Sequence, residues 1–222
     1  MILCLVTDRQ RLGAAVGAGP SEWAGALEQQ VLAAARAGID LIQVREPGLE
    51  AGELTALIRR LITACHGTAT RILVNDRLDV ALAAGAAGVH LKERSYGPSQ
   101  ARRLAPEPFL IGCSVHSPEA AVARTGADYL LAGTILPTPS KAESRLLGWE
   151  GLSAVVQAAA GKPVLGIGGL RLQSIPLLAA TGAAGLAAIG AFIPPPGEAM
   201  VEFVQKRVID MRLAFDSARS VS

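Results

Sequence analysis

Eight short apolar runs alternate with eight helix-like stretches along this chain, and this alternation is the feature that most limits its fold. The predicted strands are residues 2–7, 40–45, 71–75, 88–91, 109–114, 128–133, 163–167 and 185–189. The predicted helices are residues 22–38, 50–66, 78–84, 99–104, 118–125, 149–159, 172–181 and 198–215, with a Gly/Ala-rich loop before the first. Most strand runs are continuously apolar, as in parallel strands covered on both faces. Eight strand–helix units predict an α/β protein, a (β/α)8 TIM barrel formed by residues 1–222 as a single domain; a doubly wound sheet is the second choice.

Composition excludes several classes of protein. The chain is 50% hydrophobic, which argues against disorder, and its net charge of +2 with no basic stripe predicts no nucleic-acid partner. Its apolar runs are interrupted by glycine and too short for a membrane span, and the start lacks the basic residues of a signal peptide. Cys4, Cys65 and Cys113 form no CxxC motif, so we expect reduced thiols, with Cys113 buried and unreactive. These features predict a cytoplasmic protein and are compatible with a homodimer.

Polar or ionisable residues follow six consecutive predicted strands. In a barrel, the carboxyl ends of the strands carry the chemistry. The groups are Thr7–Arg9, Gln43–Glu46, Asn75–Arg77, His90–Glu93, Ser114–His116, and the loop 133–148 with Thr138, Ser140 and Lys141. Residues without a function would be scattered over both ends of the strands. The asymmetry therefore predicts a functional site at one end of the barrel.

The last two strand ends carry glycines instead. Gly168 and Gly169 follow the seventh strand and Gly190 follows the eighth. Glycines allow close approach of backbone N–H groups to an anion, and barrels often bind phosphate at this place. The alternative is that they only permit tight turns. Lys141 lies in a loop that either closes over a phosphorylated substrate or leaves the lysine solvated.

Each ionisable residue at the strand ends has two interpretations. His116 suits a general acid or base, whereas His90 on a short apolar strand is better explained as a satisfied core or rim histidine. Asp76 is a candidate Mg²⁺ ligand or a cap of the next helix. Arg45 requires either Glu46 or an anionic ligand as its partner.

Six segments carry a resemblance to a known family. They are LIQVRE (41–46), ILVNDRLDVALAAGAAGVHL (72–91), IGCSVHSPEAA (111–121), ADYLLAGTILPTPSK (127–141), PVLGIGGL (163–170) and GLAAIGAF (185–192). In this combination the chain resembles the thiamine phosphate synthase/TenI superfamily of (β/α)8 barrels over residues 1 to about 192. The resemblance implies a synthase that joins hydroxymethylpyrimidine pyrophosphate to a thiazole phosphate, releasing pyrophosphate with help from Mg²⁺.

The resemblance also implies a role for each matching position. It implies pyrimidine or pyrophosphate contacts for Gln43, Arg45 and Asn75, and a metal ligand for Asp76 in a synthase. Further substrate and pyrophosphate contacts are implied for Ser114, Thr138, Ser140 and Lys141. The thiazole phosphate would be held by Gly168, Gly169, Ile189 and Gly190.

Two departures from the synthase pattern favour the TenI branch. Pro47 stands where the synthase has a lysine, and Ser95 where it has a second metal-binding aspartate, with Glu93 two residues away as a substitute. The TenI branch tautomerises a thiazole carboxylate phosphate with a base and no metal. SVHS at 114–117 resembles its motif, with His116 as the proton-transferring histidine and Arg45 meeting the carboxylate.

We therefore expect a thiazole tautomerase without a cofactor. The first alternative is a thiamine phosphate synthase with Mg²⁺. The second is a non-catalytic regulator that binds a phosphorylated ligand, because barrels of one family host several functions.

Overall fold

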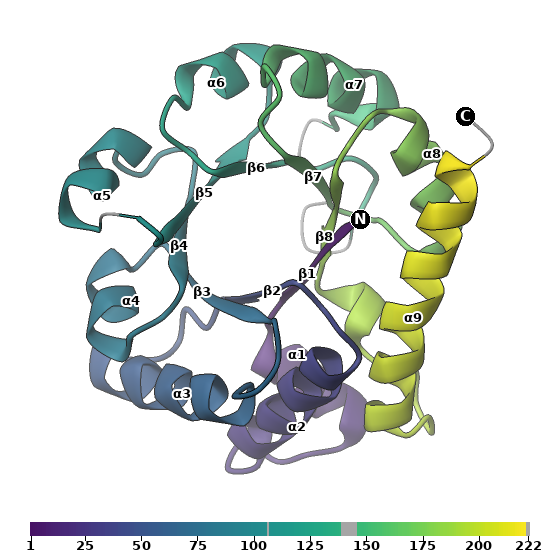
Figure 1. Ribbon diagram of the computed structural model, residues 1–222. Helices are drawn as coiled ribbons and strands as arrows, with labels where there is room; N and C mark the ends of the chain where they lie inside the picture. The colour runs from purple at the N-terminus through teal and green to yellow at the C-terminus, as the bar shows by residue number, and fades with distance from the viewer. Residues whose placement is uncertain (106, 139–145, 221–222) are drawn as a thin grey trace.

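Eight parallel strands form a closed barrel, which confirms the predicted (β/α)8 architecture (Figure 1). The computed structural model describes residues 1–105, 107–138 and 146–220. The strands are β1 (Ile2–Val6), β2 (Leu41–Val44), β3 (Arg71–Asn75), β4 (Gly88–Leu91), β5 (Leu110–Val115), β6 (Tyr129–Gly133), β7 (Val164–Ile167) and β8 (Gly185–Ala188). Each strand pairs with its sequence neighbours, and β8 closes the barrel on β1, with Ile2 opposite Gly185. All carboxyl ends therefore lie at one end of the barrel.

Helices surround the barrel as an outer ring (Figure 1). They are α1 (Arg9–Val16), α2 (Trp23–Arg36), α3 (Ala51–Ala64), α4 (Leu78–Ala84), α5 (Pro98–Leu104), α6 (Pro118–Ala123), α7 (Gly148–Ala158), α8 (Ile175–Ala180) and α9 (Met200–Arg219). Two 3₁₀ helices, η2 (Leu172–Ser174) and η3 (Gly190–Phe192), precede α8 and follow β8. The predicted helix at 172–181 therefore begins as a 3₁₀ turn. None of the described helices is long and apolar enough to cross a membrane.

Helix α1 corrects the predicted Gly/Ala-rich loop after the first strand. The Asp8 side chain accepts a hydrogen bond from the Arg11 amide at 3.0 Å, which satisfies an N-terminal donor. Gly17 ends the helix in a left-handed conformation, with φ of 71°. Leu12 is buried, and Gly13 lies against the Trp23 ring, where a Cβ would not fit. A short helix with so little apolar periodicity is stabilised by capping and packing, which the hydrophobic pattern does not reveal.

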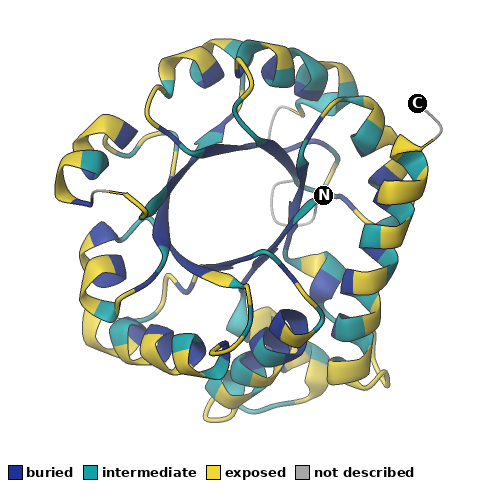
Figure 2. Cartoon of the chain, viewed as in Figure 1, coloured by how far each residue is buried: buried dark blue, intermediate teal, exposed yellow. Residues whose placement is uncertain are grey.

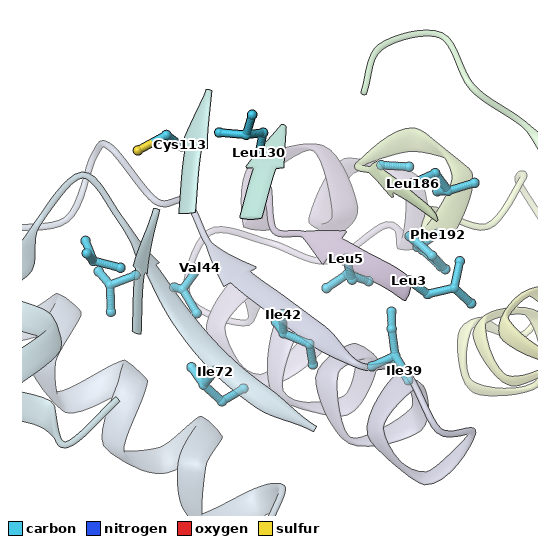
Figure 3. Packing of buried hydrophobic residues seen from close by; sticks show 14 of the residues in the cluster. Leu3, Leu5, Ile39, Ile42, Val44, Ile72, Cys113, Leu130, Leu186 and Phe192 are labelled. Atoms are coloured by element: carbon cyan, nitrogen blue, oxygen red, sulfur yellow. The ribbon is translucent and has the colours of Figure 1, made fainter. Parts of the chain in front are cut away.

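Two apolar layers lie on opposite faces of the strands. Leu3, Leu5, Ile42, Val44 and Ile72 point outward into the large cluster beneath the helices (Figure 3). The alternate residues point inward and fill the barrel; these include Cys4, Val6, Leu41, Leu73, Tyr129, Leu131, Leu165 and Ala187. Figure 2 shows the resulting pattern, a buried ring of strands within helices that are exposed on their outer faces.

Candidate functional site

The inward-facing row of the barrel becomes polar at its carboxyl end. Two residues after the buried Leu41 and Leu73, the alternation places Gln43 and Asn75 on the same inner face. Gln43 Nε2 donates a hydrogen bond to Asn75 Oδ1 at 2.9 Å. Gln43 is 3% exposed, and its buried Oε1 has no hydrogen-bond partner among the described residues. This acceptor could be satisfied by an N–H donor of a ligand.

His90, on β4, occupies the next inward position and confirms the interpretation of a satisfied core histidine. Its Nδ1 lies 3.0 Å from the Tyr129 hydroxyl, and its Nε2 lies 2.9 Å from Ser114 Oγ. Burial lowers the pKa of His90 to about 4, and burial also raises the pKa of Tyr129 well above its ordinary value. Both groups are therefore uncharged at neutral pH. Ser114, a predicted substrate contact, is thus linked to two residues of the barrel interior.

Asp76 lies directly after β3 in the left-handed conformation, with φ of 61°. It does not cap α4, whose N-cap is Arg77. Its Oδ2 lies 2.8 Å from Lys92 Nζ, and its Oδ1 accepts a hydrogen bond from the Ser95 hydroxyl. Partial burial works to raise the pKa of Asp76, but the hydrogen bonds from Lys92 and Ser95 outweigh it and lower the pKa overall. The carboxylate is therefore ionised at neutral pH, and its two oxygens are held by Lys92 and Ser95.

Glu93 pairs with His116 rather than joining Asp76. Glu93 Oε2 lies 2.8 Å from His116 Nδ1, and a second carboxylate oxygen accepts from the His116 amide at 3.3 Å. Glu93, the candidate substitute for the missing aspartate, is therefore engaged by His116 instead. Among the described residues, no group of three or more His, Cys, Asp or Glu side chains is arranged to hold a metal.

Glu46, after β2, is buried in a network that sequence reasoning did not foresee. It accepts from the Thr7 hydroxyl at 2.6 Å and from the Arg9 amide at 3.1 Å, with the Arg9 guanidinium 3.7 Å away. Burial raises the pKa of Glu46, against these hydrogen bonds. Glu46 thus ties β2 to the loop after β1 and does not pair with Arg45. The exposed Arg45 guanidinium forms no hydrogen bond or ion pair within the described part of the chain.

The glycines after β7 have a packing reason of their own. Gly168 and Gly169 both have positive φ, 104° and 70°. A Cβ on Gly168 would lie 2.5 Å from Thr134 Cγ2, and one on Gly169 would lie 2.7 Å from Leu136 Cβ. The tight-turn alternative is therefore sufficient to explain both residues. No acceptor for the Gly169 N–H is found among the described residues. This N–H could therefore donate a hydrogen bond to a phosphate.

Gly190 brings a residue into the site that sequence reasoning missed. The Arg11 guanidinium lies against it, with Nη2 2.9 Å from the position of a Cβ on Gly190. Arg11 is exposed, and its guanidinium has no hydrogen bond or ion pair with another described residue. Ile189, by contrast, is partly buried against the inner apolar cluster. Arg11 was hidden from sequence reasoning because it belongs to α1, which was predicted as a loop.

The loop after β6 is described up to Thr138 and again from residue 146. Thr138 is half-buried and makes an interaction there. Ser140 and Lys141, the other predicted contacts of this loop, lie outside the described residues. All three cysteines are free and buried, and burial raises the pKa of Cys113 to about 11, as expected of an unreactive thiol.

Comparisons with known proteins identify the family of this chain. The family model "Thiamine monophosphate synthase" matches residues 3–192. The thiamine-phosphate synthase of Methanospirillum hungatei is 40% identical over 161 residues, which are 72% of this chain and 78% of that protein. The putative thiamine-phosphate synthase of Geobacter sulfurreducens is 38% identical over 197 residues, 87% of each chain.

A solved structure extends the similarity to three dimensions. The thiamine phosphate pyrophosphorylase of Pyrococcus furiosus superposes with a TM-score of 0.79 at 30% identity, covering 98% of this chain and 96% of that one. The chain therefore belongs to the thiamine monophosphate synthase family of (β/α)8 barrel enzymes.

Proposed function

We propose that this protein is a thiamine phosphate synthase, a transferase that joins a hydroxymethylpyrimidine pyrophosphate to a thiazole phosphate. The observation that carries the proposal is its 38–40% identity to proteins named thiamine-phosphate synthase over most of their length. The tautomerase that we expected first gains no support from these relatives. Pro47 and Ser95 still depart from the synthase pattern, but the similarity over 72% and 87% of the chain outweighs these two positions.

The reaction forms one bond and breaks one. The thiazole nitrogen attacks the methylene carbon of the pyrimidine, and the carbon–oxygen bond to pyrophosphate breaks, so that pyrophosphate leaves with the electron pair. Negative charge grows on the leaving oxygen, and preorganised donors stabilise it. The Arg45 guanidinium, which has no partner within the described part of the chain, and the Asn75 amide lie at neighbouring strand ends and suit this role. The buried Gln43 Oε1, for which no partner is found among residues 1–105, 107–138 and 146–220, suits an N–H donor of the pyrimidine part.

Asp76 suits a Mg²⁺ ion that is shared with the substrate. Mg²⁺ is often held by one or two carboxylates together with substrate phosphates, and the Asp76 carboxylate is ionised. Ser95 places a hydroxyl beside it, and Lys92, whose side chain is 60% exposed, can turn away at little cost. When bound, the ion would neutralise charge on the leaving pyrophosphate. Asp76 and Ser95 are the residues that would hold it.

The phosphate of the thiazole is assigned to the turns after β7 and β8. No acceptor among the described residues is found for the amides of Gly169 and Gly190. The Arg11 guanidinium lies against Gly190 and would add a positive charge for the phosphate, whereas Leu136 lies close to Gly169. A phosphate here would lie across the barrel mouth from Asp76, which would place the two substrates on opposite sides. The proposal also includes the contacts that the family resemblance implies: the glycines, Ile189, Thr138, Ser140 and Lys141.

One observation favours tautomerase activity as a second candidate. The Glu93 carboxylate on Nδ1 of His116 leaves Nε2 as the basic nitrogen, and the His116 side chain is 45% exposed. A histidine oriented by a carboxylate in this way is suited to proton transfer. If this activity is present, His116→Ala abolishes isomerisation of the thiazole carboxylate phosphate. An unchanged rate would remove the assigned role.

The deciding experiment supplies both synthase substrates to the purified protein. We expect thiamin phosphate to form with Mg²⁺ and to stop forming when the metal is chelated. If no product forms at high enzyme concentration, the synthase proposal is rejected and isomerisation is assayed on the same preparation. Calorimetric binding of the phosphorylated thiazole with neither activity would instead identify a non-catalytic regulator.

A further inference from the structure

A buried hydrogen-bond chain runs from the barrel interior to the candidate site. Tyr129, on β6, lies 3.0 Å from His90, and His90 lies 2.9 Å from Ser114. Tyr129 and His90 are 4% and 1% exposed. The Tyr129 ring occupies the space beside Gly112, where a Cβ would lie only 2.1 Å from Tyr129 Cζ. Any side chain at position 112 would displace the phenol, so this glycine makes the chain possible.

The direction of each hydrogen bond follows from the number of donors. Within the described residues, His90 Nδ1 is the one hydrogen-bond partner found for the Tyr129 hydroxyl. If the hydroxyl accepted from Nδ1, its own proton would be buried without an acceptor, which is unfavourable. The hydroxyl therefore donates to Nδ1. The other ring nitrogen, Nε2, then carries the proton, because a neutral imidazole has one donor and one acceptor.

The tautomer of His90 determines how the Ser114 hydroxyl is oriented. His90 Nε2–H donates to Ser114 Oγ, so the serine hydroxyl accepts on the side of His90 and must direct its own proton elsewhere. Ser114 is only partly buried, and it lies near the carboxyl end of β5, at the barrel mouth. The opposite tautomer would reverse this and offer the substrate an acceptor.

We infer that Tyr129 and His90 are positioning residues that set Ser114 as a hydrogen-bond donor, so that the site selects substrates with an acceptor atom at that point. This inference rests on the proposed function only in that Ser114 contacts the substrate. Two acceptor chemistries are suited to it, a ring nitrogen lone pair and an anionic oxygen of pyrophosphate. Inorganic pyrophosphate and the unphosphorylated hydroxymethylpyrimidine distinguish them as separate probes.

The first test needs neither ligand nor turnover. Nitrogen chemical shifts of ¹⁵N-histidine in the folded protein report the tautomer, and His90→Gln identifies the His90 signal among the three histidines. We expect the Nε2–H tautomer in the wild type and a mixture in Tyr129→Phe. Tyr96→Phe removes a hydroxyl from the other tyrosine, which is 41% exposed, and should leave the shifts unchanged. A predominant Nδ1–H tautomer in the wild type would overturn the inference.

The second test is a double-mutant cycle on binding of the two probes. Tyr129→Phe should weaken binding of one probe about 10-fold in the wild type and have no effect in a Ser114→Ala background. His90→Gln retains an N–H donor for Ser114 and should bind more tightly than His90→Leu. An equal effect of Tyr129→Phe in both backgrounds would show that Tyr129 acts independently of Ser114 and would overturn the inference. Failure to make thiamin phosphate would reject the synthase proposal without altering either readout.

Discussion

The two sides of the barrel mouth are built on different principles. At the ends of β1 to β5, the polar side, side chains hold one another: Glu46 with Thr7 and Arg9, Asp76 with Lys92 and Ser95, and His90 with Ser114. At the ends of β7 and β8, the glycine side, Gly168, Gly169 and Gly190 bring no side chain of their own, and the backbone is partly exposed. The polar side can orient a substrate by geometry, whereas the glycine side offers only N–H groups and the nearby Arg11. The polar side is thus suited to orienting a substrate, and the glycine side to anchoring its phosphate.

The largest expected effect comes from removing the charge on the polar side. Asp76→Asn keeps a residue that tolerates the left-handed backbone, so the protein should remain folded. Without the carboxylate, the Mg²⁺-dependent rate of thiamin phosphate formation should fall on the order of 1000-fold. Steady-state kinetics at saturating Mg²⁺ measure it. A rate within 10-fold of the wild type would contradict the role of Asp76.

The glycine side is tested by adding a single methyl group. Gly168→Ala combines a positive φ of 104° with a clash against Thr134, so the free energy of unfolding should fall by about 4 kcal/mol. Gly38→Ala is the matched control, since Gly38 has φ of 85° but no atom within 4 Å of an added Cβ. It should lose only about 1–2 kcal/mol. Equal losses in urea denaturation would mean that the loop after β6 yields to the methyl group.

Protonation of His90 should lower the free energy of unfolding as the pH falls. The pKa of His90 is about 4 in the fold and 6.5 when unfolded, so the unfolded chain takes up the proton first as the pH falls. Stability present at pH 7 is therefore lost between pH 6.5 and 4, by about 3 kcal/mol. His90→Gln should show a correspondingly smaller loss in this window, and His66→Gln should retain the wild-type loss. Identical pH profiles for wild type and His90→Gln would contradict this assignment.

The smallest expected effect concerns the cation beside the glycine side. Arg11→Ala should weaken binding of the thiazole phosphate about 10-fold, because one charge-assisted hydrogen bond is lost. Binding of the thiazole alcohol, which lacks the phosphate, should not change. Arg36→Ala removes another exposed arginine, at the end of α2 that leads into β2, and serves as the control. Isothermal calorimetry measures all three, and equal losses for the phosphate and the alcohol would exclude a phosphate contact.

The sequence predicted most of the scaffold because its elements are locally encoded. Residues 71–75, 78–84 and 88–91 were predicted as strand, helix and strand, and they coincide with β3, α4 and β4. Helix α1 was missed because its stability comes from the Asp8 cap and contacts with Trp23 rather than from apolar periodicity. The sequence could not predict the hydrogen-bond partners of Glu46 and Glu93, because Thr7 and His116 lie 39 and 23 residues away.

By itself, the sequence determined the barrel and the end of it that carries the polar residues and glycines, because strand order and side-chain alternation follow from the order of the chain. Its similarity to synthases over most of its length also determined the family. Only the tertiary structure decided which polar groups meet: Tyr129 with His90, Lys92 with Asp76, and Arg11 beside Gly190. Hydrogen bonds and ion pairs act over about 3 Å, and only closure of the barrel brings residues so distant in sequence that close together.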